Sequence, residues 1–231
     1  MFIARTASAF ALVLFAAAVH CAQGSVWEDK PYGEWSKEDI VKIISESPWA
    51  KVVGASDTNG SFSYVTIRLR SALPIRQALV RLKQIDSKYE KMSEKKREEF
   101  DRMMEGALVC PACDDNYVVS IGPPISYREL KSGIFALRNI RLESLLGKVY
   151  LSNDKGEKRE IVHFVDPKSN DGEATLFFPR WNEKGEPLLT ADSQALTLIF
   201  EIKGSQYSGT ALPISTKFDV RPMRLEGSVE F

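Results

Sequence analysis

Histidine and cysteine are scarce in this sequence, which contains two residues of the first type and three of the second. His20 and Cys21 lie near its beginning, so only His163, Cys110 and Cys113 remain in the body of the chain. A zinc or other transition-metal site built on imidazole and thiolate needs several such side chains close together. The scarcity argues against a metal centre, and we expect neither a metal nor a cofactor.

A surplus of either charge is also missing, because 31 Lys and Arg residues balance 31 Asp and Glu residues. A basic surplus would indicate nucleic acid as a partner, and an acidic one would indicate a solvating tail. Hydrophobic residues make up 44% of the chain, which is ordinary for a globular protein. The sequence therefore predicts a folded chain that does not bind nucleic acid.

No apolar run is long enough to span a membrane. The longest uncharged one, Ala9 to Val19, has about half of the roughly twenty residues that a spanning helix needs. It follows Arg5 and ends in small residues, which is the layout of a secretory signal. We therefore predict that residues 1–22 are a cleaved signal peptide, that the mature chain has no membrane span, and that it is secreted or periplasmic.

The end of this signal leaves two outcomes open. Cleavage after Ala22 would leave His20 at a position where a small residue is preferred. Alternatively, Cys21 follows an apolar and small triplet, although its last member is His20, and a lipid-modified cysteine occupies such a position. A lipidated Cys21 would make the protein an outer-envelope lipoprotein instead of a freely soluble one.

Signals for local structure begin with a helix after Ser36. Asp39 follows three residues later in a capping-box pattern, and Ser47-Pro48 ends the helix, because a residue before proline avoids helical conformations. Residues 54–61 are small and polar, which predicts a loop. Residues 62–69 then alternate between two kinds of side chain, which predicts a strand with one buried face.

Two further helices are expected before residue 110. Pro74 suits the first helical position, and an apolar stripe at steps of three and four residues extends to Met92. This stripe predicts the longest helix of the chain. Ser93 then starts another helix, which is expected to run to Glu105 and to be closed by Gly106.

The remainder of the chain consists of short strand patterns separated by turns. The predicted strands cover 117–121, 149–152, 159–165, 174–178, 195–203, 216–220 and 225–231. Such spacing is typical of an antiparallel sandwich. We therefore predict an α+β fold.

The expected organisation has three parts. They are the signal peptide 1–22, a helix-rich N-terminal region 23–109 with one or two strands, and a strand-rich, β-sandwich-like region 110–231. The pattern leaves open whether the last two parts are separate domains or share one core.

Cys110-Pro111-Ala112-Cys113 is the sharpest local motif, and it has three interpretations. A redox-active dithiol is the first, but such a motif usually follows a strand and opens a helix, whereas this one follows a helix and precedes a strand. Half of a zinc site is the second, for which His163 and nearby aspartates would have to supply the rest. The third, which we favour, is a short structural disulfide formed in an oxidising compartment.

Other candidate residues are better explained by structure than by chemistry. His163 lies in a predicted strand, and no nucleophile motif accompanies it, so a structural role is expected. The basic run 95–97 has glutamates on both sides, which indicates a solvated helix face. The four tryptophans could line a glycan or peptide groove, but packing is the more economical explanation for Trp27, Trp35 and Trp49.

Four segments carry a resemblance to a known group of proteins. They are Glu34–Asp39 (EWSKED), Ser47–Lys51 (SPWAK), Ser71–Leu79 (SALPIRQAL) and Leu176–Arg180 (LFFPR). In these segments the chain is similar to a family of uncharacterised exported bacterial proteins, best represented in acidobacteria. The resemblance implies structural roles for Trp35, Pro48, Trp49 and Pro179, and it implies no activity, cofactor or active-site residue.

These patterns predict a non-enzymatic envelope or secreted protein that presents an interaction or structural surface to an unknown protein partner. One alternative is a thiol–disulfide oxidoreductase that uses Cys110 and Cys113. The other is a lipid-anchored accessory protein of an envelope complex.

Overall fold

The structure is a computed structural model that describes residues 25–231 except 57–61, 126–131, 170–171, 203–211 and 226–227. The predicted signal peptide and the candidate lipidation residue Cys21 therefore lie outside the described residues.

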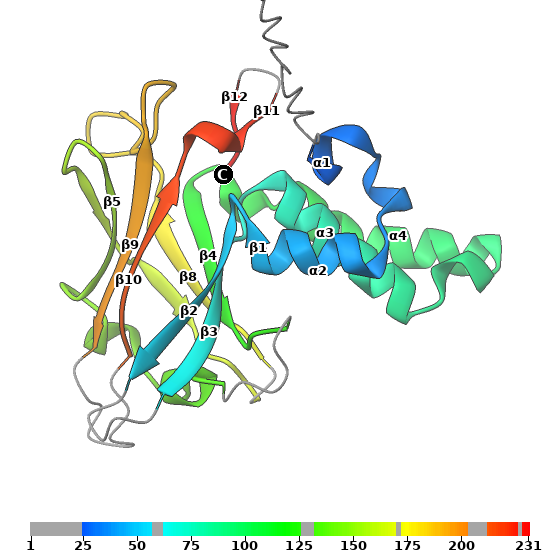
Figure 1. Ribbon diagram of the computed structural model, residues 1–231, viewed down its shortest axis with the longest axis horizontal. Helices are drawn as coiled ribbons and strands as arrows, with labels where there is room; N and C mark the ends of the chain where they lie inside the picture. The colour runs from blue at the N-terminus through cyan, green and yellow to red at the C-terminus, as the bar shows by residue number, and fades with distance from the viewer. Residues whose placement is uncertain (1–24, 57–61, 126–131, 170–171, 203–211, 226–227) are drawn as a thin grey trace, which may run out of the picture.

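The described helices form a layer on one side of the molecule (Figure 1). The α-helices are α1 (Val26–Asp29), α2 (Lys37–Ser45), α3 (Leu73–Asp86) and α4 (Glu94–Val109). Short 3-10 turns are η1 (Tyr32–Glu34), η2 (Tyr89–Lys91), η3 (Pro111–Cys113), η4 (Ile134–Leu137), η5 (Leu142–Ser144) and η6 (Arg221–Met223).

Two antiparallel sheets make up the other side. The six-stranded sheet runs in the order β1 (Glu46–Ser47), β2 (Ala50–Ser56), β3 (Phe62–Leu69), β4 (Asn116–Gly122), β8 (Ala174–Pro179) and β7 (His163–Val165). The four-stranded sheet runs in the order β10 (Leu212–Asp219), β9 (Ala195–Ile202), β5 (Val149–Asn153) and β6 (Lys158–Glu160). A hairpin of β11 (Arg224–Leu225) and β12 (Ser228–Val229) follows. The predicted α+β class is confirmed.

Both sheets and the helical layer contribute to one apolar core. Ile67 of β3, Phe200 of β9 and Ile75 of α3 belong to a single cluster of buried side chains. β3 pairs with β4 over Thr66–Leu69, so strands from the helix-rich and the strand-rich halves of the sequence lie in one sheet. The six-stranded sheet therefore needs strands from both halves of the sequence.

Helices cover the second face of the six-stranded sheet, and this corrects the expected burial of β3. The strand was predicted to have one buried face, but Thr66 and Arg68 are buried as well as Val65 and Ile67, which alternate with them. The Nε atom of Arg68 donates a hydrogen bond of 2.6 Å to the Ile44 carbonyl of α2, directly above the strand. Alternation in the sequence could not indicate the covering layer, because that layer is formed by another segment.

The helical layer differs from prediction at two turns. α3 ends at Asp86 and not near Met92, because Lys88 takes a left-handed conformation, with φ of 55°, that reverses the chain. α4 is consequently the longest described helix and extends past Gly106 to Val109. Cys110, with φ of 52°, ends it in the place expected for the glycine.

Three strand predictions also need correction. Residues 50–56 form β2, although 54–61 were expected to be a loop. Residues 159–165 divide into β6 and β7, which belong to different sheets. Residues 225–231 do not form one strand: Leu225 belongs to β11, Ser228 and Val229 form β12, and the last two residues lie outside the hairpin.

The capping box of α2 is confirmed. The Ser36 hydroxyl accepts a hydrogen bond of 3.1 Å from the Asp39 amide, and the Asp39 carboxylate accepts one of 3.0 Å from the Ser36 amide. Replacing Ser36 with alanine should lower the free energy of unfolding by about 1 kcal/mol. Ser93 of α4 makes no such bond, so Ser93→Ala is the control and should have a much smaller effect in urea denaturation. Equal effects of the two variants would contradict the prediction.

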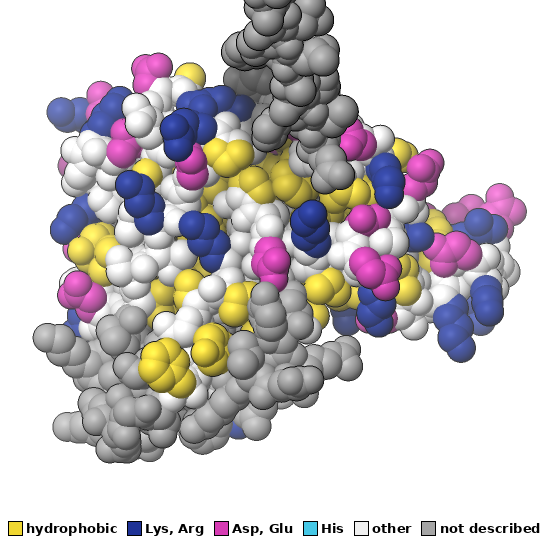
Figure 2. All heavy atoms as spheres, viewed as in Figure 1, with side chains coloured by type: hydrophobic (Ala, Val, Ile, Leu, Met, Phe, Trp, Pro, Cys, Tyr) yellow, Lys and Arg dark blue, Asp and Glu magenta, His cyan; other side chains and the backbone are white. Residues whose placement is uncertain are grey.

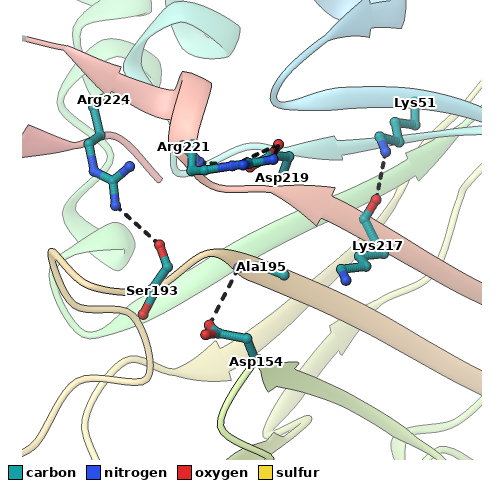
Figure 3. Close-up of polar contacts among 8 residues, drawn as sticks. All are labelled: Lys51, Asp154, Ser193, Ala195, Lys217, Asp219, Arg221 and Arg224. Carbon is teal, nitrogen blue, oxygen red and sulfur yellow. Dashed lines mark hydrogen bonds and ion pairs between the residues drawn. The ribbon is translucent and has the colours of Figure 1, made fainter.

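Polar contacts close one end of the four-stranded sheet (Figure 3). The Arg224 guanidinium donates to the Ser193 carbonyl at 3.2 Å, and the Asp154 carboxylate accepts from the Ala195 amide at 3.4 Å. Asp219 and Arg221 form an ion pair of 2.5 Å at the end of β10. These bonds connect the strand ends to the turns that follow them.

The Asp219 carboxyl provides a test of this pairing. Hydrogen bonds from the Arg221 guanidinium and amide lower its pKa from the ordinary 3.8 to about 2. A lowered pKa means that the contribution to stability is complete above pH 4 and is lost as the pH falls from 4 towards 2. Carbon NMR of the side-chain carboxyl should give a midpoint near 2, and Arg221→Ala should return it towards 3.8. An unchanged midpoint in the variant would contradict the assignment.

Candidate functional site

The Cys110 and Cys113 sulfur atoms lie at bonding distance in a tight turn between α4 and β4. Their Cα atoms are 5.4 Å apart, and the Cys113 amide donates a hydrogen bond of 2.8 Å to the Cys110 carbonyl. Cys113 is buried, with 6% of its surface exposed, whereas Cys110 is half-buried. Cys110 is therefore the more accessible residue of the pair.

Two arginines hold this turn. The Arg76 guanidinium of α3 donates to the Leu108 carbonyl and, at 2.9 Å, to the Val109 carbonyl at the end of α4. Arg180 donates from Nε to the Cys113 carbonyl at 3.2 Å, and its guanidinium lies 4.6 Å from the ring centroid of Tyr117. The turn is thus fixed to α3 and to the end of β8.

The position of the motif weighs against strong thiol reactivity. A helix N-terminus stabilises a thiolate, but Cys110 follows the C-terminus of α4, where the helix dipole has its negative end. The Arg76 contacts to the last carbonyls offset part of that negative charge. The chemistry of this turn suits a structural disulfide. Because Cys110 is only half-buried, slow exchange with a thiol of another molecule is also compatible with it.

The other candidates from the sequence do not assemble into a site. His163 is exposed on β7, with its ring 5.1 Å from that of Phe177. The Asp115 carbonyl accepts from the Arg180 amide, which is a backbone role. Within the described ranges, no three His, Cys, Asp or Glu side chains are close enough to hold a metal ion. The described helices are also too short or too polar to cross a bilayer.

The N-terminal tryptophans pack as predicted. Trp35 and Trp49 are buried, and the Trp27 ring lies edge-on to Trp49 at a centroid distance of 5.2 Å. Trp181 is different, with 46% of its surface exposed near the end of β8. The tryptophans therefore form no common groove.

A cleft lies in the helical layer. It has a volume of about 310 Å³ and lies between η1, α3, η2 and the first turns of α4. Its lining consists of Tyr32, Gly33, Arg81, Gln84, Tyr89, Glu90 and Arg97. Two phenol rings, two guanidinium groups and an amide thus meet at one opening.

Hydrogen bonds fix part of this lining. Arg81 donates from Nη1 to Glu90 at 2.6 Å and to the Gln84 side-chain oxygen at 3.2 Å. Tyr89 donates from its hydroxyl to Asp101 at 2.8 Å, and its ring lies edge-on to Phe100. The Arg81 side chain is consequently held in place before any ligand arrives.

Two ionisable groups of the cleft have pKa values that are shifted away from pH 7. The backbone amide of Glu90 and then the Arg81 guanidinium lower the pKa of the Glu90 carboxyl. The hydrogen bond to Asp101 and then partial burial raise the pKa of the Tyr89 phenol. Near pH 7 the carboxylate stays charged and the phenol stays neutral, so neither is poised to exchange a proton.

Sequence reasoning missed this cleft. The basic run 95–97 was interpreted as a solvated face, and its members are indeed exposed, but Arg97 also lines the opening. Its neighbours come from residues 32–33, 81–84 and 89–90, which the reversal at Lys88 brings together. The only available signal was the combination of Tyr and Arg residues around the end of α3.

Charges on the visible face are mixed, and basic and acidic side chains alternate over the sheets and the helical layer (Figure 2). In comparisons with known proteins, no family model, no curated protein and no solved structure matches the chain.

Proposed function

We propose that this protein is a non-enzymatic binding protein of the cell envelope or the extracellular space, and that the cleft in its helical layer holds the ligand or partner. The observation that carries the proposal is the chemistry of the lining. Guanidinium, phenol and amide groups recognise other molecules well, and the pKa values of Glu90 and Tyr89 are shifted further from pH 7, which favours binding over acid–base catalysis as the role of this lining.

The two sheets have the role of a scaffold in this proposal. We take them to form a β-sandwich, which the single core shared by their facing strands supports. α2 and α3 are anchored to it through their buried residues, among them Ile43, Ile44 and Ile75. A rigid body of this kind holds the cleft open for a partner.

Site-specific photo-crosslinking tests the proposal. Benzoylphenylalanine in place of Tyr89, at the cleft, should give an adduct of one defined mass in the native envelope. The same probe in place of Tyr150, which is half-buried on β5, is the control and should give none. Arg97→Gln should reduce the adduct and Lys96→Gln should not. Absence of a defined adduct from Tyr89, or equal yields from the two positions, would overturn the proposal.

Export is part of the same proposal. The signal-like layout of residues 1–22 and the resemblance to exported bacterial proteins support it. Mass spectrometry of the mature N-terminus would distinguish cleavage after Ala22 from acylation of Cys21, and the second result would make the protein a lipid-anchored accessory protein. An N-terminus that still begins at Met1 would contradict export by this signal.

A second candidate function is thiol–disulfide exchange, favoured by the unequal exposure of Cys110 and Cys113. A substrate thiolate would attack the Cys110 sulfur, the bond between the two cysteines would break, and Cys113 would leave as a thiolate. A second thiol of the substrate would then attack the mixed disulfide, so that the substrate dithiol is oxidised and the protein disulfide is reduced.

Oxidation of a reduced dithiol peptide by a stoichiometric amount of the protein tests this candidate. Exchange faster than with oxidised glutathione, and lost in Cys113→Ser, would support it. A rate no greater than that of glutathione would leave the disulfide a structural role only.

A further inference from the structure

We infer that the cleft between η1, α3, η2 and α4 binds a small oxyanion, a carboxylate or phosphate group, against Arg97, Arg81 and Gln84. This inference rests on the proposed binding function and names the chemistry of its ligand.

The unused hydrogen-bonding groups of the cleft are mainly donors. Among the described residues, Arg97 makes no side-chain hydrogen bond or ion pair, so the whole donor edge of its guanidinium is available. Arg81 uses Nη1 for Glu90 and Gln84, and its Nη2 has no partner in the described part of the chain. A lining with spare donors selects a ligand rich in acceptors.

Gln84 supplies the most deeply placed donor. Its side chain oxygen accepts from Arg81 at 3.2 Å, which turns the amide nitrogen to the other side. Only 7% of the residue is exposed, but its nitrogen is not among the buried side-chain atoms that lack a partner. Gln84 also lines the cleft, so its amide is a donor that an acceptor atom of a ligand can reach there.

The Glu90 carboxylate of the cleft pairs with only one of its two guanidinium groups, so the other can pair with a negatively charged ligand. Glu90 lies 2.6 Å from Arg81 and neutralises one of the two guanidinium groups, while its own side chain is 57% exposed. Arg97 is left without such a counter-charge in the described structure. One added negative group would therefore complete the pairing, and the planar fork of Arg97 matches the two oxygens of a carboxylate or phosphate.

Size and walls restrict the ligand further. A volume of about 310 Å³ is near the lower end for small-molecule sites. Tyr32 and Tyr89 give the opening two aromatic walls beside the donors. These features fit a compact anion with a small organic body better than a long charged polymer.

Titration of the full protein with inorganic phosphate and, separately, with benzoate tests the inference, with calorimetry for affinity and NMR of the Gln84 side-chain amide for location. Binding of either anion should move the Gln84 signal, and the arm that binds identifies the group. Arg97→Gln should weaken binding about tenfold. Lys96→Gln removes the same charge one residue away, outside the cleft lining, and should change affinity less than twofold.

Glu90→Gln adds a test in the opposite direction. It removes the competing carboxylate from Arg81, so affinity should rise several-fold, a result that a damaged fold would not give. Equal losses in Arg97→Gln and Lys96→Gln, or no shift of Gln84 with either anion, would overturn the inference. If the Tyr89 probe still crosslinked a partner that neither anion displaced, the binding function would stand and only the oxyanion chemistry would fail.

Discussion

Replacing Arg68 with alanine is expected to lower the free energy of unfolding by about 3 kcal/mol. The Arg68 side chain is fully buried, and its guanidinium lies 2.6 Å from a Glu173 oxygen. Its Nε bonds the Ile44 carbonyl and so joins β3 to α2. The variant would leave both acceptors without this partner and would open a cavity between helix and sheet. Because Glu173 is 22% exposed and also contacts Arg70, we place the loss at the lower end of the range for buried pairs.

Arg70 provides the matched control. It pairs with the other oxygen of the same Glu173 at 2.9 Å, but its side chain is 34% exposed. An ion pair with such access to water contributes little, so Arg70→Ala should cost less than about 1 kcal/mol. Urea denaturation of both variants measures the difference. Similar losses would show that charge at Glu173, and not burial of Arg68, sets the effect.

Trp49→Ala is expected to destabilise the protein by about 4 kcal/mol, because truncation of a fully buried aromatic side chain removes apolar contacts and leaves a cavity. Trp49 contacts Trp27, and its indole N–H donates a hydrogen bond of 2.7 Å to the Glu230 carbonyl. The side chain therefore connects α1, the start of β2 and the segment after β12.

Two companion variants separate these contributions in urea or thermal denaturation. Trp49→Phe keeps an aromatic ring but loses the hydrogen bond, and should cost about 1–2 kcal/mol. Trp181→Ala removes the half-exposed tryptophan and should cost less than about 1 kcal/mol. A Trp49→Ala loss no larger than that of Trp181→Ala would contradict the central position assigned to Trp49.

Local signals in the sequence predicted the parts of the fold that depend on neighbouring residues. The capping box at Ser36 and Asp39 fixes the start of α2 through bonds within one turn, and the alternation in 62–69 corresponds to β3. β2 was not predicted, because residues 50–56 combine small, polar and apolar side chains without a clear pattern. Their strand conformation depends on pairing with β3. The burial of Arg68 was not predicted for a related reason, since the helices that cover it come from other segments of the chain.

The candidate site was less predictable than the fold. The pairing of Cys110 with Cys113 was visible from spacing, because the two residues share one turn. The cleft was not, since its residues approach each other only after Lys88 takes a left-handed conformation that no Gly or Asn marks in the sequence. A basic residue on a charged helix also looks the same in sequence whether it faces solvent or a cleft, as Arg97 shows.

The pairing of β4 has a consequence for how the chain reaches its folded state. Residues 116–122 contact β3 on one side and residues 174–179 on the other, and the Trp49–Glu230 bond joins positions 181 apart in sequence. Contacts this distant form late, and folds that depend on them assemble in milliseconds to seconds instead of microseconds. Until β8 is made, one side of β4 has unpaired backbone groups beside apolar side chains, which is the kind of edge that promotes aggregation. Chaperone demand during synthesis should therefore be highest between the emergence of β4 and that of β8.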